Sequence, residues 1–459
     1  MFIAADGRNL SFTFCLVSSL FLLWGFCNGM IDVMDKHFQE SLHLTLSQSA
    51  WVQFAHYLGY FLMALPAGLL AQRLGYKGGI IAGLLIVALG GFWFLAATRI
   101  ALFWAFLLGV CLIASGLTFL ETVANPYTSV LGDPRYAAVR INLAQSCNGV
   151  GWILGPIAGS LFFYSVDSSG VSTGAQNLHI PYVGVAVVVL ILAGVFALAY
   201  VPDIKAEDIG HPTGLAARDP SAHEASPLWS QPHFTMAVVA QFFYVAAQAG
   251  IFSFFINYMT SEVPAIPASW AVAMERLALH AGVLKGWLSD WFRGDAAGAL
   301  SISDKGAANL ASLAFVCFLI GRVSGSALLR KIAAHQAVAV YGLVNVLLTL
   351  LVFARLGWLS VACVFLSYFF MSIMFPTIFA LGIYGLGSHT KRASAYIVMA
   401  IMGGAILPKL MGYVADQYGL ARSFIVPTAC FAIAAYYGLR WPQYTGSAGL
   451  HEPAPPNVL

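Results

Sequence analysis

Residues 79–97 read GIIAGLLIVALGGFWFLAA, nineteen residues without one charged or amide side chain. A helix needs about 20 predominantly apolar residues to cross the hydrocarbon core of a bilayer, so this stretch predicts a membrane-spanning helix. The whole chain has the same character, because 60% of its 459 residues are hydrophobic and 9% are charged. A typical soluble domain has roughly 25% charged residues to keep its surface wetted. We therefore expect lipid to be the solvent for most of this chain.

Apolar runs separated by glycine, proline or charged residues predict six helices in each half of the chain. In the first half they lie near 12–34, 49–71, 79–97, 101–131, 139–165 and 181–201. In the second half they lie near 233–261, 308–330, 336–354, 358–387, 393–415 and 421–440. The predicted fold is an all-α membrane protein with twelve transmembrane helices in two six-helix bundles.

A polar stretch at 202–232 divides the chain near its centre and has the composition of a linker. It would join an N-terminal bundle at 1–201 to a C-terminal bundle at 233–445, which is followed by a tail at 446–459. Two six-helix halves with a long linker are the outline of a transporter with internal repeats, in which substrate binds between the halves. A channel has less need of that duplication.

Lysine and arginine in short loops predict the orientation, since these residues remain preferentially on the cytoplasmic side. If both termini are cytoplasmic, the short inner loops hold eight such residues and the short outer loops hold four. The inner residues are Arg73, Lys77, Arg135, Arg140, Arg330, Lys331, Lys391 and Arg392, and the outer ones are Lys36, Arg99, Arg355 and Arg422. We therefore expect an integral protein of the bacterial inner membrane with both termini inside and an uncleaved first helix.

Several classes of function are disfavoured by what the sequence lacks. The net charge of +3 is spread out, which argues against nucleic-acid binding. All seven cysteines lie in apolar stretches away from metal-ligand spacings, so we interpret them as small buried hydrophobic residues. No nucleophile–base pair, metal motif or phosphate loop indicates an enzyme. We expect no cofactor and a monomer in contact with lipid.

The predicted outer loop at 261–306 is unusually long, and loops of this length generally have a function or are disordered. Apolar residues recur within it at alternating spacings of four and three, which places them on one helical face. They are Trp270, Met274, Leu277, Ala281, Leu284, Leu288 and Trp291. We predict a helix on the membrane surface or over the mouth of a cavity, and the alternative is a surface helix without a role in transport.

Two acids stand out within the apolar runs, namely Asp32 in the first predicted helix and Glu121 in the fourth. A charged side chain at the centre of a membrane helix costs at least about 2.5 to 3.5 kcal/mol, so each acid calls for an explanation. Low dielectric favours the neutral form of a carboxyl group, and such a group can carry a proton near physiological pH. The alternative is that each acid is hydrogen-bonded to its neighbours and serves packing.

Amides and aromatic rings recur at helical spacing in three further helices. They are Asn142, Gln145 and Asn148 in the fifth helix, Gln241, Tyr244, Gln248 and Asn257 in the seventh, and Gln53, Tyr57 and Tyr60 in the second. Amides can read sugar hydroxyls while rings cover the apolar faces of a sugar. Interhelical hydrogen bonding remains the alternative for any one amide, and rings alone would indicate a packed core.

Two basic residues lie in an apolar context, Arg322 in the eighth helix and Lys409 in the eleventh. Each needs an anion, an open cavity or a route to the interface. Lys409 follows Pro408 and is a candidate for gating or substrate contact. The alternative is that its side chain extends to the membrane interface.

At these residues the chain resembles the fucose, glucose and galactose:proton symporter family of the major facilitator superfamily. The resemblance covers LLWGFCNGMIDV, GYFLMALPAGLLAQRLGYK, ETVANPY, RINLAQSCNGVG, FFYVAAQ, FMSIMFPTIFALGIYGLG and IVMAIMGGAILPKLMGYVAD. ETVANPY with RINLAQSCN after it is specific to the family, whereas GLLAQRLGYK is a loose form of a signature found across the superfamily. The linker, the outer loop and the C-terminal tail fall outside the resemblance.

The resemblance implies sugar uptake driven by the proton gradient, by alternating access between two bundles. It places Glu121 at the family's proton-carrying glutamate, Asp32 at its helix 1 aspartate tied to coupling and sugar binding, and Gln145 and Asn148 at sugar-contacting amides. We include Asn28, Gln241, Tyr244, Gln248 and Lys409 among the expected sugar contacts.

The chain departs from the family's fucose carriers at positions that bear on the sugar. Those carriers have a Gln-Tyr pair before the helix 10 proline where this chain has Met374 and Phe375, and they tend to have a second Asn where this chain has Gly29. The expected substrate is therefore L-fucose or a related hexose. The alternatives from other classes are a proton-driven antiporter that exports amphiphilic compounds and a sugar sensor without transport.

Overall fold

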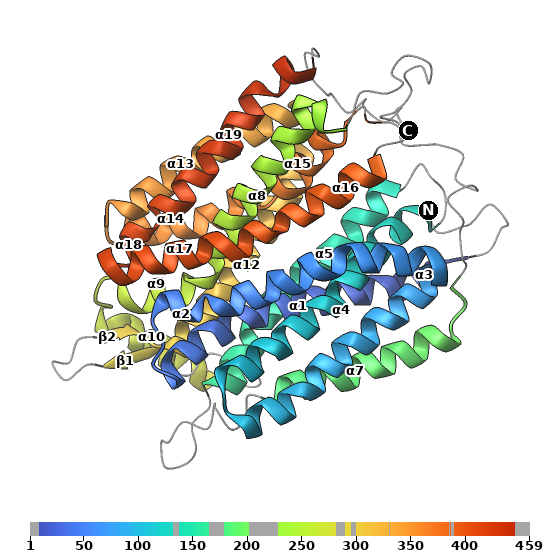
Figure 1. Cartoon of the computed structure of the whole chain (residues 1–459). Coiled ribbons are helices and arrows are strands. Elements are labelled where there is room, and N and C mark those ends of the chain that lie inside the picture. Colours follow the sequence, from blue (N-terminus) through green and yellow to red (C-terminus); the bar gives the residue numbers. More distant parts are fainter. Residues whose placement is uncertain are drawn as a thin grey trace. The chain divides into compact units, whose positions relative to one another are not determined.

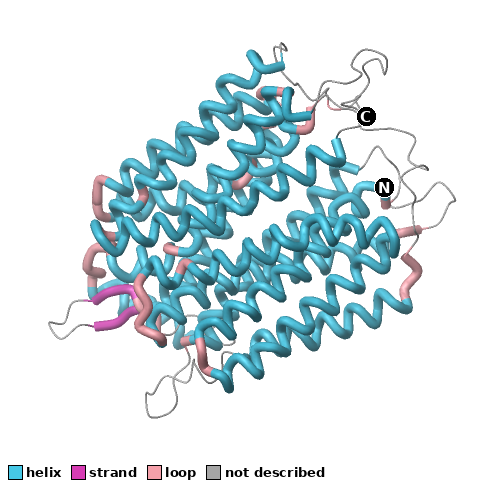
Figure 2. The backbone as a smooth tube through the Cα atoms, viewed as in Figure 1, coloured by secondary structure: helices cyan, strands magenta, loops and turns pink. Residues whose placement is uncertain are grey.

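The structure is a computed structural model that describes residues 9–131, 137–164, 179–201, 228–280, 290–294, 300–329, 331–384, 386 and 390–445. Nearly all of these residues are helical, and one two-stranded hairpin is present (Figure 2). Most of the predicted linker and the whole predicted tail at 446–459 lie outside the described residues. The chain forms two compact units: unit 1 comprises Met1–Pro212 and Phe252–Phe315, and unit 2 comprises Thr213–Ile251 and Val316–Leu459.

The elements of unit 1 before residue 201 are coloured blue to green, and those between residues 252 and 315 are coloured yellow-green to gold (Figure 1). They are α1 (Ser11–Ser41), α2 (Leu46–Ser49), α3 (Trp51–Ile100), α4 (Phe103–Val130), α5 (Ala137–Phe163), α7 (His179–Leu198), α9 (Phe255–Ser261), α10 (Ala268–His280), β1 (Phe292–Gly294), β2 (Leu300–Ile302) and the first half of α12 (Asp304–Leu328). Within this unit α1 packs against α5, and α3 packs against α4 and α7.

Unit 2 holds most of the elements of the second half of the chain. They are η3 (Leu228–Ser230), α8 (Pro232–Ser253) up to residue 251, the second half of α12, α13 (Ala334–Phe353), α14 (Trp358–Met371), α15 (Met374–Gly382), α16 (Thr390–Met399), η6 (Ala400–Met402), α17 (Gly403–Tyr418), α18 (Leu420–Ser423) and α19 (Ile425–Thr445). α13 packs against α14 and α19. Two side chains of α13 form hydrogen bonds to the neighbouring helices. Asn345 Oδ1 accepts from Ser367 Oγ on α14 at 2.8 Å, and Thr349 Oγ1 accepts from Thr428 Oγ1 on α19 at 2.8 Å.

Each of the twelve predicted spans is helical in the structure. Among the described residues ten helices are long and apolar enough to cross a membrane. The remaining two predicted spans are the first part of α3 and α5, and both are continuous helix. The predicted pair at 49–71 and 79–97 forms one long helix, α3, that is interrupted at Gly75. Gly75 has a φ of 70°, which glycine adopts without strain and other residues rarely adopt. The glycine therefore fixes the position of the turn between the two spans.

The predicted end of the first helix was wrong. Charged residues after Met34 suggested an end, but α1 continues to Ser41. The charges fit into the helix because Lys36 Nζ pairs with Glu40 Oε1 at 2.9 Å, four residues along the same face. The helix ends where His43 adopts a left-handed φ of 51°. Asp32 therefore lies well inside the helix and not near its end.

The helix predicted within residues 261–306 is present over Ala268–His280 as α10. The expected stripe was wrong at its far end, because Trp291 lies outside α10 and precedes the hairpin of β1 and β2, which pair antiparallel from Phe292 to Ile302. The stripe residues at 281, 284 and 288 lie outside the described residues.

Close backbone contact between α1 and α5 depends on glycine. A Cβ on Gly25 would lie 2.0 Å from the backbone oxygen of Asn148, and one on Gly151 would lie 2.2 Å from that of Leu22. Small residues let membrane helices approach in this way. Gly29 belongs to the same contact, since its Cβ would lie 2.9 Å from the oxygen of Trp152. This packing is a physical reason for glycine at a position where the family's fucose carriers tend to have an asparagine.

Candidate functional site

Asp32 is the centre of a buried polar cluster in unit 1. Its side chain is 5% exposed, and Gln53 Nε2 on α3 donates a hydrogen bond of 2.7 Å to Oδ1. The other oxygen, Oδ2, has no hydrogen-bond partner in the part of the chain that the structure describes. A buried polar atom without a partner costs about 1 to 3 kcal/mol. The second oxygen is thus suited to a proton or to a ligand hydroxyl.

Trp24 and Asn28 precede Asp32 at intervals of four residues, so the three side chains share one face of α1. Trp24 Nε1 donates to the hydroxyl of Tyr60 on α3 at 2.6 Å. Asn28 is buried, and its Oδ1 lacks a partner among the described residues. α1 therefore presents an aromatic ring, an amide and a carboxylate along one line, which is the combination that suits a sugar.

Glu121 lies on α4 and is partly exposed. No described residue forms a hydrogen bond or ion pair with its carboxylate. Tyr57 on α3 is within electrostatic range of both Glu121 and Asp32, and Tyr60 is within range of Glu121. The structure thus brings the two predicted acids into one region, joined by the tyrosines of α3. Because none of the described residues supplies a counter-ion, Glu121 is a candidate for carrying a proton.

His56 is a site residue that the sequence analysis missed. It is buried on α3 with its ring centroid 5.1 Å from that of Tyr57 and 5.0 Å from that of Tyr60. Its Nδ1 has no partner within the described ranges. The available signal was its position between Gln53 and Tyr57, in a helix whose polar residues already pointed to a lined cavity.

Asn148 and Gln145 lie on α5, near the glycine contact with α1. Asn148 is buried, and its Nδ2 donates to the backbone oxygen of Phe21 at 3.2 Å. This bond is of the interhelical kind that the sequence left open as an alternative. Gln145 is half-buried, and the side chain of Asn142 lies outside the described residues.

Gln241 is the most informative polar residue of unit 2. It is 0% exposed in α8, and neither Nε2 nor Oε1 has a partner among the described residues. Tyr244, one turn further, is buried and donates its hydroxyl proton to the backbone oxygen of Met371 at 2.7 Å. Gln248 is half-buried on the same helix. The predicted stripe ends there, because the helix breaks at Phe254 and Asn257 falls on α9 in unit 1.

The basic residues predicted in apolar context are both half-buried in unit 2. Arg322 Nε donates to the oxygen of Ser372 at 3.4 Å, and its guanidinium lies 5.0 Å from the ring centroid of Phe318. Lys409 lies on α17 next to the buried Pro408. Met374 is buried on α15, where its sulfur accepts from Asn345 Nδ2 at 3.7 Å.

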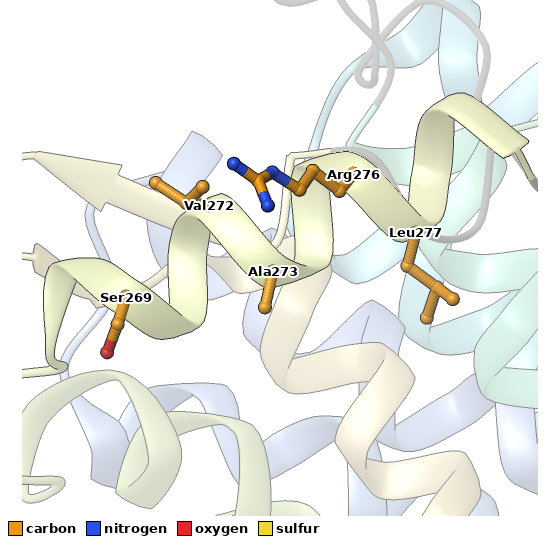
Figure 3. A pocket seen from close by; sticks show the side chains of 5 residues that line it. All are labelled: Ser269, Val272, Ala273, Arg276 and Leu277. Carbon is orange, nitrogen blue, oxygen red and sulfur yellow. The ribbon is translucent and has the colours of Figure 1, made fainter.

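A hollow on α10 does not have the composition of a site. Ser269, Ala273 and Leu277 point to one side of the helix and Val272 and Arg276 to the other (Figure 3). The described residues contain no group of three or more His, Cys, Asp or Glu that could hold a metal ion.

Many membrane-spanning helices with buried acids and amides on otherwise apolar faces define a carrier of polar solutes. The chain belongs to the major facilitator superfamily, whose family model matches residues 12–407. This assignment confirms the predicted fold class.

Individual relatives match along most of their length. The chain is 33% identical over 447 residues to the L-fucose-proton symporter of Escherichia coli, covering 94% of this chain and 93% of that one. It is 31% identical over 433 residues to the glucose/galactose transporter of Brucella abortus, covering 94% of each. The crystal structure of the transporter FucP in the outward conformation matches with a TM-score of 0.64 and 32% identity, covering 94% of this chain and 98% of that one. The resemblance drawn from the motifs is confirmed.

Proposed function

We propose that this chain is a proton-coupled sugar uptake transporter that works by alternating access. The observation that carries the proposal is a set of buried polar atoms that have no hydrogen-bond partner among the described residues: Oδ1 of Asn28, Oδ2 of Asp32 and both amide atoms of Gln241. Each such atom is destabilising until it is paired, and a ligand rich in hydroxyl groups offers both donors and acceptors. An amphiphilic export substrate would leave these atoms unpaired.

Glu121 is the proposed proton carrier, and Asp32 links it to the sugar. A proton from outside neutralises Glu121, and sugar then binds with the help of Asn28, Asp32, Gln145 and Asn148 in unit 1. Gln241, Tyr244, Gln248 and Lys409 are the proposed contacts in unit 2. After reorientation Glu121 loses the proton to the cytoplasm, and the restored charge weakens the sugar site. Reorientation with only one of the two bound would dissipate the gradient, so the fully loaded and empty forms must be the ones that cross.

The substrate class of the proposal is L-fucose or a related hexose. Two relatives that align with this chain over 93 to 94% of their own length are named for L-fucose or for glucose and galactose. The Met374 and Phe375 pair offers no amide or hydroxyl, which favours a sugar read at fewer positions by unit 2. The proposal includes no cofactor beyond the coupling proton, and no enzymatic step.

The same proposal covers location and organisation. The chain is placed in a bacterial inner membrane as a monomer in lipid, with both termini and the 202–232 linker cytoplasmic, and without nucleic-acid partners. The proposed bundles are 1–201 and 233–445.

Uptake of labelled L-fucose into cells that express the chain tests the proposal, with unlabelled galactose, glucose, mannose and N-acetylglucosamine as competitors. We expect uptake that a protonophore abolishes, and the strongest competitor identifies the preferred sugar. Uptake of none of these sugars by protein shown to be in the membrane would contradict the proposal. A change in drug susceptibility would then favour an exporter, and sugar binding without uptake a sensor.

A further inference from the structure

A third acid of α1, Asp35, lies one turn beyond Asp32 and has no part in the mechanism above. Its side chain is 1% exposed. Ser253 is the last residue of α8 and belongs to unit 1. Its Oγ donates a hydrogen bond to Asp35 Oδ2. The other oxygen, Oδ1, is buried and has no partner among the described residues. Asp35 is thus buried where α1 meets the segment that leads into α9.

The charges near Asp35 do not supply it with a cation of its own. Lys36 Nζ lies 2.9 Å from Glu40 Oε1 and 3.8 Å from Asp304 Oδ1, so two other carboxylates share this lysine. The titratable and charged groups that face this region are Asp32, Lys36, His37 and Glu40 on α1, Asp304 on α12 and Tyr164 after α5, while α2 and α8 contribute Ser49 and Ser253. Among the described residues of this region, one lysine therefore faces four carboxylates.

Burial of an ionised Asp35 in this arrangement would be expensive. A carboxylate taken out of water costs several kcal/mol unless a cation and further hydrogen bonds compensate it. Ser253 donates to one oxygen of Asp35, Ser49 is a second hydroxyl facing the same carboxyl group, and the shared Lys36 is the nearby cation. The other oxygen, Oδ1, has no hydrogen-bond partner among the described residues. His37 does not provide the missing charge, because a protonated imidazole would itself bury an unpaired N–H at Nε2. A single proton on Asp35 removes the excess charge.

We infer that Asp35 is a second proton-binding residue of the transporter, and that residues 253–261 pack against this end of α1 only when Asp35 is protonated. The inference rests on the proposed function, in which this end of α1 faces outside. The proton comes from the outer water, forms an O–H bond on Asp35 when the segment packs, and returns to the same water when the segment separates. Asp35 therefore sets the dependence on external pH and adds nothing to the number of protons carried across.

Counterflow exchange of labelled sugar tests the inference. The sugar is L-fucose, or D-galactose if that is the sugar the protein transports. We use Glu121→Gln as the parent, because it removes the transported proton. Exchange by the parent should fall as external pH rises, by up to about tenfold per pH unit once Asp35 ionises. Asp35→Asn, which has the shape of the protonated acid, should abolish this fall. Exchange that falls equally in both variants would overturn the inference.

Ser253→Ala is the matched variant at the same contact. It removes the hydrogen bond but keeps the carboxyl group, so exchange should still fall at alkaline pH. A purely structural role for the contact would make Ser253→Ala and Asp35→Asn behave alike, which would also overturn the inference. Asp290→Asn, in a side chain that is 72% exposed and outside the spans, should leave the pH profile unchanged.

A second readout does not require transport. Met259 on α9 is buried, so a cysteine there reports separation of the segment from α1. In Met259→Cys protein, labelling by a membrane-impermeant maleimide should accelerate as external pH rises, and Asp35→Asn should remove the acceleration. Equal acceleration in both would refute the role of Asp35. Failure of the wild-type chain to exchange any sugar would refute the proposed function and leave this measurement intact.

Discussion

Gln241→Leu is expected to stabilise the folded protein and to raise the KM for sugar uptake. Gln241 is fully buried and neither atom of its amide has a partner within the described residues. Each such group costs about 1 to 3 kcal/mol, so the low end for two groups gives about 2 kcal/mol. Leucine has a similar volume and no polar atoms. The free energy of unfolding should rise by about 2 kcal/mol, and the thermal midpoint by a few degrees.

The same substitution removes two proposed hydrogen bonds to the sugar. At about 1 kcal/mol each they amount to about 2 kcal/mol, which corresponds to a roughly 30-fold rise in KM for uptake. Thermal unfolding is followed by a fluorogenic thiol reagent, since Cys27, Cys363 and Cys430 are buried and free. Uptake kinetics are measured in cells at equal expression.

Asn345→Leu is the matched control, because Asn345 is also fully buried in unit 2 but has its amide satisfied. Its Nδ2 donates to the oxygen of Tyr341 at 3.0 Å, and its Oδ1 accepts from Ser367. This substitution should lower the thermal midpoint, opposite in sign to Gln241→Leu. The reasoning is refuted if both variants are destabilised alike, or if KM in Gln241→Leu equals that of the wild type.

Two further substitutions test the packing around the site. Gly25→Ala places a Cβ 2.0 Å from the Asn148 backbone oxygen and should cost about 1 to 3 kcal/mol, measured as a lower thermal midpoint, whereas Gly68→Ala, with nothing within 4 Å, should not. An unchanged midpoint in Gly25→Ala would contradict the contact between α1 and α5. Tyr244→Phe removes the donor to the Met371 oxygen and should lower stability by about 1 kcal/mol without altering protonophore sensitivity. Uptake that becomes insensitive to protonophore would instead place Tyr244 in the coupling step.

The helices could be predicted from the sequence because apolar length is a local property. All twelve predicted runs are helical, and Gly75 marks the turn within α3. The end of α1 could not be predicted, since charged side chains after residue 34 look like a loop until their partners are known. Lys36 finds Glu40 on its own helix and Asp304 on α12, and the second partner is distant in sequence.

The candidate site could be predicted in part for the same reason. Asp32 could be singled out as an acid within an apolar run, whereas Asn28 was included only after the resemblance to the family, and both side chains are buried. Hydrogen bonds between side chains on different helices could not be predicted from the sequence, because they depend on how the helices pack. The bond that Gln53 donates to Asp32 is an example. His56 was missed because its significance depends on the tyrosine rings around it, and Asp35 because its helix had been ended too early.

Accumulation of sugar by Glu121→Gln is the measurement that tests the central claim most directly. Glutamine has the shape of the protonated acid and cannot release a proton. Cells with this variant should exchange labelled sugar for unlabelled sugar across the membrane, yet hold no more sugar inside than outside. The wild type should accumulate sugar until a protonophore is added. If Glu121→Gln accumulates sugar against its gradient, Glu121 is not the proton carrier and the account of coupling is wrong.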